Sequence, residues 1–269
     1  MERIDMKKNG SYIDVYQTAD TPKAAVVICP GGGYEHLSER EAEPVARKFV
    51  EDGYLAVVLW YEVAAPLLGD LPLWQLSDTV IWLREQEEKY QISDKNIYVC
   101  GFSAGGHLAA SLGILWNKKE YFRPDTDLCL HKPAGMILSY PVISSGKYAH
   151  RSSLVRLAGK EMQKQERYSL EKYVDKDCVP TFLWGTFADE LVPVENSLLL
   201  LNELAKNKIP VEYHLFPNGV HGLSLADEEV AEPAKQRNPD VHIARWMNLC
   251  LEWLDHIMEK KEKKEMDKK

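Results

Sequence analysis

The sequence predicts an α/β protein with a mainly parallel central sheet flanked by helices. Two observations indicate this class. Short apolar runs recur along the chain, and segments of helical length and helical hydrophobic spacing separate them. Strands that are buried on both faces of a parallel sheet are apolar throughout, and most of these runs have that character. Because the alternation continues to the last helix, we expect a single domain over residues 1–258.

Seven runs rich in β-branched and aromatic residues are the expected strands. Each is short, as buried strands usually are, and turn-forming residues border most of them. The expected strands are residues 12–16, 24–29, 54–61, 96–100, 135–140, 181–184 and 211–216.

Five segments between or after these runs are the expected helices. Ser38 and Glu41 form a capping-box pattern that opens the first helix, and Gly53 follows its expected end at residue 52. The second has apolar residues at helical spacing from Leu76 onward. The expected helices are residues 38–52, 76–90, 103–116, 194–206 and 240–260.

One long interval, residues 141–180, interrupts this alternation. Its segments 151–159 and 160–172 are polar and helix-like, so we expect a short helical insertion over one end of the sheet. Connections of this length in compact domains are commonly lids or binding elements, although an ordinary crossover helix with a long loop is the alternative. The charged segment 259–269 is expected to be a solvated C-terminal tail.

Composition and charge exclude several classes of protein. The chain has 269 residues, 45% of them hydrophobic and 28% charged, which suffices for a large core. The net charge is −8, and the body before residue 259 is more acidic still, so neither nucleic acid nor an anionic membrane is an expected partner.

The expected location is the cytoplasm. No apolar stretch approaches the length of a membrane span, and no signal-peptide pattern follows the charged N-terminus. Five cysteines are odd in number and lack the close spacing of zinc or redox motifs, which fits a reducing compartment.

Residues 101–105, Gly-Phe-Ser-Ala-Gly, directly follow an expected strand and open an expected helix. A G-x-S-x-G match in that context is typical of a nucleophile elbow, in which a sharp turn exposes the serine and requires small residues on both sides. Ser103 is therefore the candidate nucleophile. An incidental serine in a glycine-rich turn is the alternative.

A serine nucleophile needs a base, and the base needs an orienting acid. Asp189 comes just after the strand at 181–184, and His221 lies in a glycine-flanked loop after the strand at 211–216. Parallel strands bring such positions to one edge of the sheet. Glu190 is the alternative acid.

The tetrahedral intermediate also needs donors for its oxyanion. The amide after the nucleophile, at Ala104, is one candidate. Gly32 and Gly33, in a glycine-rich loop after the strand at 24–29, are the others. Such a loop could instead bind phosphate, but the residues here match neither G-x-x-x-x-G-K-[ST] nor G-x-G-x-x-G, the two glycine patterns that bind phosphate groups.

These motifs resemble the α/β-hydrolase esterases grouped with feruloyl and acetylxylan esterases. The resemblance covers about residues 24–253 and is strongest in "CPGGGYEHLSEREAEPVARKF", "VCGFSAGGHLAASLG", "PTFLWGTFADELVPVENSLLL" and "FPNGVHGLSLA". It implies the α/β-hydrolase fold and a serine esterase that acts on short acyl esters, acetyl esters of small sugars above all, without metal or organic cofactor. By position, it implies a triad of Ser103, Asp189 and His221.

The residues that contact the substrate are predicted from their positions near the expected active site. Tyr34 and Trp60 are the expected substrate-binding residues, and Trp60 and Glu62 stand where relatives often have polar or cationic side chains. An aryl-formamidase or amidase using the same triad is the main alternative, and a non-catalytic binding protein of this fold is a third. The expected partner is a small-molecule ester, and a homodimer is an expectation from the frequency of symmetric dimers.

Overall fold

The computed structural model describes residues 1–6 and 9–266. Eight strands form one sheet in the order β1-β2-β4-β3-β5-β6-β7-β8. The strands are β1 (Glu2–Met6), β2 (Ser11–Tyr16), β3 (Ala25–Cys29), β4 (Leu55–Trp60), β5 (Ile97–Phe102), β6 (Met136–Ser139), β7 (Thr181–Thr186) and β8 (Val211–Phe216).

The sheet is parallel from β4 to β8, and β2 at one edge pairs antiparallel with both β4 and β1. The central strand β5 lies between β3 and β6, with Cys100 beside Ile28 and Ile137. The carboxyl ends of β3 and β5 to β8 therefore meet at one edge, which is where parallel sheets place binding sites.

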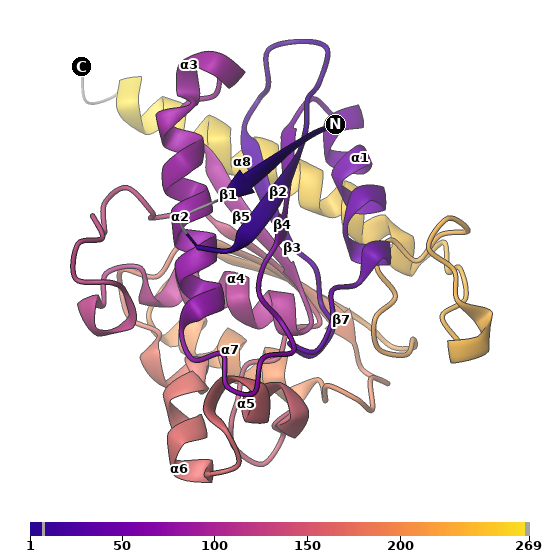
Figure 1. Ribbon diagram of the computed structural model, residues 1–269. Coiled ribbons are helices and arrows are strands. Elements are labelled where there is room, and N and C mark those ends of the chain that lie inside the picture. The colour runs from indigo at the N-terminus through magenta and orange to yellow at the C-terminus, as the bar shows by residue number, and fades with distance from the viewer. Residues whose placement is uncertain (7–8, 267–269) are drawn as a thin grey trace.

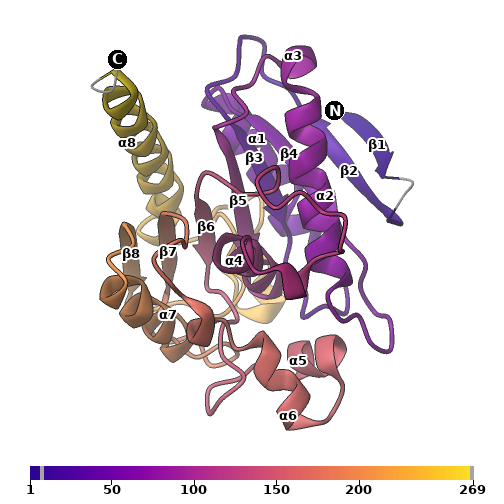
Figure 2. The same cartoon turned by 90° about the vertical axis from the view of Figure 1, so that its left-hand side faces the viewer.

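Helices cover both faces of this sheet (Figure 2). On one face, α2, α4 and α7 contribute buried residues such as Leu76, Leu112 and Leu200 to one core. On the other face, α1 and α8 contribute Phe49 and Trp246 to a second core. The α-helices are α1 (Glu43–Glu51), α2 (Leu71–Glu85), α3 (Glu87–Tyr90), α4 (Ala104–Leu115), α5 (Arg151–Ala158), α6 (Met162–Gln165), α7 (Glu195–Lys206) and α8 (Trp246–Met266).

Among the described residues there are also six short 3-10 turns: η1 (Glu39–Glu41), η2 (Lys119–Tyr121), η3 (Glu166–Tyr168), η4 (Leu170–Tyr173), η5 (Pro233–Lys235) and η6 (Ile243–Arg245). The segment 259–269 continues α8 as far as Met266, and its last three residues lie outside the described part. Within that part, no helix is both long enough and apolar enough to cross a membrane.

All seven expected strands are present, with small shifts at their ends. Strand β1 was not predicted; it has the sequence Glu-Arg-Ile-Asp-Met and is mostly exposed. An edge strand with charged side chains has no apolar run to reveal it. Its pairing with β2 decides its structure.

The capping box expected at the first helix is wrong. Ser38 makes no capping hydrogen bond, and a 3-10 turn precedes the helix proper, which begins at Glu43. The Glu41 side chain is buried and contacts the active-site loops instead. A tertiary interaction has replaced the local one.

The insertion at residues 141–180 lies at the carboxyl edge of the sheet, where α5 and α6 form the lower end of the molecule in Figure 1. The expected helix at 151–159 corresponds to α5. The expected helix at 160–172 is instead divided among α6, η3 and η4.

Candidate active site

The turn between β5 and α4 holds Ser103 in a strained conformation, with φ 54° and ψ −115°. Such a backbone costs on the order of 1–3 kcal/mol in a residue other than glycine, and strain of this kind clusters at functional sites. The turn closes because its neighbours are glycines. A Cβ atom on Gly101 would lie 2.1 Å from the Gly105 carbonyl oxygen, and one on Gly105 would lie 2.0 Å from that of Cys29.

Three side chains from distant parts of the chain meet beside this turn. His221 Nε2 lies 2.7 Å from Ser103 Oγ, and His221 Nδ1 lies 2.6 Å from Asp189 Oδ2. The side chains of His221 and Asp189 are 9% and 2% exposed, so bulk water does not compete strongly for these bonds. Glu190, the alternative acid, is exposed. The structure thus joins the histidine to Asp189.

Asp189 is fixed by the backbone that follows it. Its Oδ1 accepts hydrogen bonds from the amides of Leu191 at 3.0 Å and Val192 at 2.9 Å, while Oδ2 faces the imidazole. Since a carboxylate only accepts, His221 Nδ1 donates the proton of that bond. His221 Nε2 is then the acceptor for the Ser103 hydroxyl, which is the arrangement that a general base requires.

The glycine-rich loop lies against Ser103. A Cβ atom on Gly31 would be 3.1 Å from Ser103 Cβ. The Gly31 amide is already engaged, because it donates to Glu41 Oε2 at 2.8 Å. Within the described part of the chain, the amides of Gly32, Gly33 and Ala104 have no hydrogen-bond acceptor, as donors reserved for an oxyanion would require.

Glu41 and Tyr140 connect this loop to His221, a role that no sequence pattern predicted for either residue. The Tyr140 hydroxyl donates to Glu41 Oε1 at 2.7 Å and accepts from the Ser224 amide at 2.9 Å. The Tyr140 ring also meets the His221 ring edge to face, with centroids 5.0 Å apart. A single buried pair therefore joins the glycine-rich loop at residues 30–34, which is the candidate oxyanion loop, to the His221 imidazole and the loop after it.

Two arginines hold the loop that contains His221. Arg237 Nε donates to the His221 carbonyl at 3.0 Å, and Arg40 Nη1 donates to the Gly222 carbonyl at 2.9 Å. Both arginines are far from His221 in sequence, so no local pattern indicates them. Guanidinium groups suit this task because their donors point in several fixed directions.

His107, four residues after the nucleophile, is a neutral connector. Its Nε2 faces the Tyr168 carbonyl at 2.9 Å and must donate, so Nδ1 accepts from the Tyr34 hydroxyl at 3.0 Å. Burial lowers the pKa of His107 to about 4. The elbow helix is thereby joined to the oxyanion loop and to the insertion.

A cavity of about 260 Å³ opens above the triad. Residues from the oxyanion loop, the insertion and the loops after β7 and β8 line it. Besides Ser103 and His221, the lining side chains are polar except for Leu191, and they include Glu35, His36, His150, Ser152 and Arg237. The described residues contain no group of three His, Cys, Asp or Glu side chains able to hold a metal ion.

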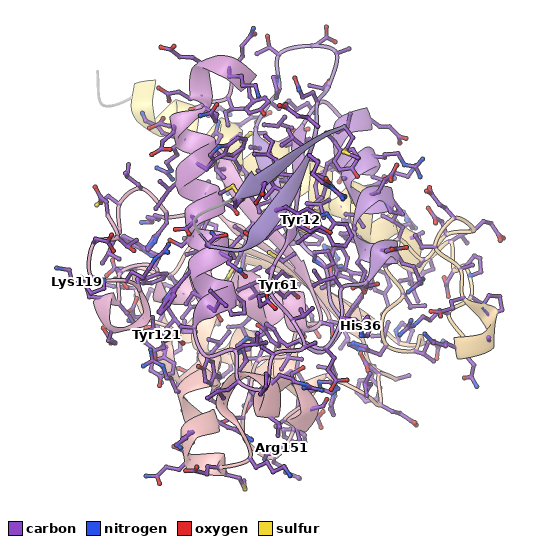
Figure 3. The ribbon with its side chains drawn as sticks, in the orientation of Figure 1. Tyr12, His36, Tyr61, Lys119, Tyr121 and Arg151 are labelled. Carbon is purple, nitrogen blue, oxygen red and sulfur yellow. The ribbon has the colours of Figure 1, made fainter. Side chains whose placement is uncertain are left out.

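The positions of Tyr34 and Trp60 do not support the substrate contacts expected of them. Tyr34 is 1% exposed and turns away from the cavity toward His107. Trp60 pairs with Tyr12 across β4 and β2 and lines a separate groove of about 760 Å³. Figure 3 shows Tyr12 far from Arg151, where the insertion helix α5 begins. Sequence position alone did not reveal which way either ring points.

Comparison with known proteins agrees with this geometry. The BD-FAE family model matches residues 13–204. Endo-1,4-beta-xylanase B of Butyrivibrio fibrisolvens is 37% identical over 215 residues, which are 78% of this chain but only 34% of that protein.

Two solved structures match over nearly the whole chain. The acetyl ester-xyloside bifunctional hydrolase of Caldicellulosiruptor lactoaceticus has a TM-score of 0.80 at 33% identity, covering 92% of this chain and 88% of its own. A carboxylesterase of Lactobacillus plantarum has a TM-score of 0.81 at 28% identity, covering 95% and 96%. The chain therefore belongs to the BD-FAE family and has the α/β-hydrolase fold of carboxylic ester hydrolases.

Proposed function

We propose that this protein is a serine esterase that hydrolyses short acyl esters, acetyl esters in particular, of small polyhydroxylated alcohols such as sugars. The observation that carries the proposal is the continuous hydrogen-bonded series from Asp189 through His221 to the strained Ser103. Nucleophile, base and orienting acid are within hydrogen-bond reach of one another, as acyl transfer requires.

The reaction follows from this geometry. Ser103 Oγ attacks the acyl carbon while His221 Nε2 takes the hydroxyl proton, and Asp189 stabilises the resulting imidazolium. The amides of Ala104 and of Gly32 or Gly33 stabilise the oxyanion of the tetrahedral intermediate. The alcohol leaves with the proton from His221, and water then repeats the two steps to release the acid and restore the serine.

The polarity of the cavity favours a hydroxylated alcohol over an aryl substrate. Apart from imidazoles, no aromatic side chain of the described residues lines the cavity above Ser103. The aromatic side chains that would suit an aryl-formamide point elsewhere. Tyr34 and Trp60 lie as described above, and Trp74 donates its indole N–H to the Tyr121 carbonyl at 2.8 Å. Relatives that include an acetyl ester-xyloside hydrolase support the acetyl and sugar preference.

The test is a substrate panel with a matched pair of serine variants. Ester hydrolysis is measured on p-nitrophenyl acetate, butyrate and octanoate, on acetylated xylose and on N-formylkynurenine. We expect the highest kcat/KM for acetyl esters, and a loss of at least about 10⁴-fold in kcat for Ser103→Ala. Ser111→Ala, on the same helix, should retain wild-type activity.

Two results would overturn the proposal. One is hydrolysis that survives in Ser103→Ala, and the other is a preference for N-formylkynurenine over every ester. Labelling by a fluorophosphonate probe, lost in Ser103→Ala, separates an active triad from a wrong choice of substrate. The cytoplasmic location expected from the sequence stays a prediction, to be checked by fractionating cells that produce the tagged protein.

A further inference from the structure

The insertion places a histidine in the catalytic cavity. His150 immediately precedes α5 and lines the same cavity as Ser103 and His221. A Cβ atom on Gly33 would lie 3.7 Å from His150 Cε1, so the imidazole lies next to the glycine-rich loop. None of the catalytic steps above uses this side chain.

The structure fixes the orientation of this imidazole. His150 Nδ1 lies 2.8 Å from the hydroxyl of Ser153, which is completely buried in the first turn of α5. Nε2 is within 3.3 Å of the hydroxyl of Ser152, which is exposed and free to rotate away. One nitrogen is therefore anchored inside the insertion, and the other is available to a ligand.

The imidazole is also neutral near pH 7. Burial lowers the pKa of His150 from its ordinary value, and proximity to His221 lowers it further, while the carboxylates of Asp189 and Glu35 oppose the shift in part. A neutral imidazole nitrogen can donate or accept a hydrogen bond, according to its tautomer, without introducing a charge beside the general base. A hydroxyl group, which both donates and accepts, is the natural partner for such a nitrogen.

An ion pair between Glu35 and Arg156 joins the insertion to the glycine-rich loop beside His150. Glu35 lines the cavity from the oxyanion loop, and Arg156 Nε of α5 donates to its carboxylate at 2.9 Å. Ser103 and Asp189 lie at the strand ends instead, so the insertion lines the cavity without supplying a residue of the candidate triad.

We propose that His150 is a specificity-determining residue whose Nε2 forms a hydrogen bond with a hydroxyl group on the alcohol part of the substrate ester. The proposal rests on the esterase function proposed above and identifies the residue that recognises a carbohydrate alcohol. Ser153 is its positioning residue. A site built to bind a hydroxyl discriminates against an otherwise similar ester that lacks one.

The experiment compares two acetyl esters that differ in the alcohol. Acetylated xylose retains free hydroxyls beside the ester, whereas p-nitrophenyl acetate has none. His150→Phe keeps a ring of similar size but removes both nitrogens. We expect its kcat/KM to fall roughly 3- to 10-fold on acetylated xylose, mainly through KM, since a hydrogen bond of this kind contributes that much. The value on p-nitrophenyl acetate should change less than twofold.

Two further variants separate recognition from structure. His150→Gln places an amide near the position of Nε2 and should recover most of the lost activity on acetylated xylose, whereas His150→Asn is too short to do so. Ser153→Ala should produce a smaller loss in the same direction, because it frees the ring without removing it. Thermal unfolding of each variant establishes that it is folded.

Specific results would overturn the proposal. An equal loss on both esters would mean that His150 only maintains the cavity. No loss on either ester would mean that no substrate hydroxyl reaches the ring. If the wild-type protein hydrolyses neither ester in a Ser103-dependent way, the esterase function itself fails, and that result is distinct from the other two.

Discussion

The two walls of the catalytic cavity are held in different ways. In the sheet wall, formed by Ser103, Asp189 and His221, backbone groups at the ends of buried strands hold the first two residues, and two arginines hold the loop of the third. The Ser103 amide donates to the Ser139 carbonyl at 2.9 Å, and two amides hold Asp189. The insertion wall, formed by His150 and Ser152, depends on side-chain contacts and on an exposed ion pair.

This difference separates chemistry from specificity. Backbone hydrogen bonds within a parallel sheet cannot change without disturbing the core, so the reacting groups keep one geometry. The insertion is a surface connection whose side chains can change at little cost to the fold. We therefore expect substitutions in the sheet wall to abolish catalysis, and those in the insertion wall to alter the choice of substrate.

In the sheet wall, we expect Asp189→Asn to cause a large loss of activity. An asparagine amide can donate to His221 Nδ1 and favour the tautomer that cannot act as base, so kcat should fall by roughly 10³- to 10⁴-fold. The measurement is hydrolysis of p-nitrophenyl acetate. Glu190→Gln, at the exposed neighbour, is the matched control and should stay within twofold of wild type. Equal losses in both variants would refute the assignment of Asp189.

The oxyanion loop gives the next largest effect. In Gly32→Ala, the added Cβ would lie 2.0 Å from the His36 carbonyl oxygen, and φ is +129°, so the loop must move away from its position over Ser103. Loss of one oxyanion donor costs roughly 10²- to 10³-fold in kcat. Gly69→Ala also has a positive φ, but nothing lies within 4 Å of its Cβ, so it should preserve kcat. A Gly32→Ala protein with wild-type kcat would exclude this glycine from the site.

His107 connects the two walls and should make stability depend on pH. Its pKa is about 4 in the folded state, because of burial, and near 6.5 in the unfolded chain, so the unfolded state binds more protons between these values. The free energy of unfolding should therefore fall by up to about 3 kcal/mol as the pH drops from 6.5 to 4.

Urea unfolding at several pH values tests this dependence. His107→Gln can still donate to Tyr168 and accept from Tyr34 but does not titrate in this range, so its stability should decline less on acidification. His256→Gln, on the exposed side of α8, should behave like the wild type. Parallel curves for all three proteins would show that His107 does not contribute to acid sensitivity.

The smallest effect is expected at the ion pair of the insertion wall. Arg156→Gln removes the partner of Glu35, but both side chains are substantially exposed, and such pairs contribute little to stability. The Tm should therefore match that of the wild type within measurement error. A large drop in Tm would mean that the insertion is as integral to the fold as the strand ends, and would remove the contrast between the two walls.

The sequence was sufficient to predict those parts of the candidate site whose geometry is set by neighbouring residues or by the direction of the strands. An apolar strand followed by Gly-x-Ser-x-Gly and a helix predicts the elbow at Ser103, because only glycines fit the close contacts on both sides of the turn. Asp189 and His221 could be predicted because parallel strands bring their carboxyl ends together.

At other positions, a local sequence pattern is compatible with more than one tertiary contact. Ser38 and Glu41 satisfy a capping box, yet Glu41 bonds to Gly31 and to Tyr140, ten and ninety-nine residues away. Trp60 is the last residue of β4 and follows five fully buried residues, but its half-buried ring faces a groove remote from Ser103. No single-sequence pattern encodes which partner a buried carboxylate or a half-buried ring will contact.

The sequence by itself thus determined the class of fold, the turn that holds Ser103 and the chain order of the three residues that meet there, because hydrophobic periodicity and glycine placement act over a few residues. Only the tertiary structure decided that Asp189 and not Glu190 faces His221, that Glu41 fixes the oxyanion loop, and that His150 enters the cavity. These outcomes depend on contacts between segments far apart in the chain, and the packing of the whole molecule selects among alternatives that are equivalent locally.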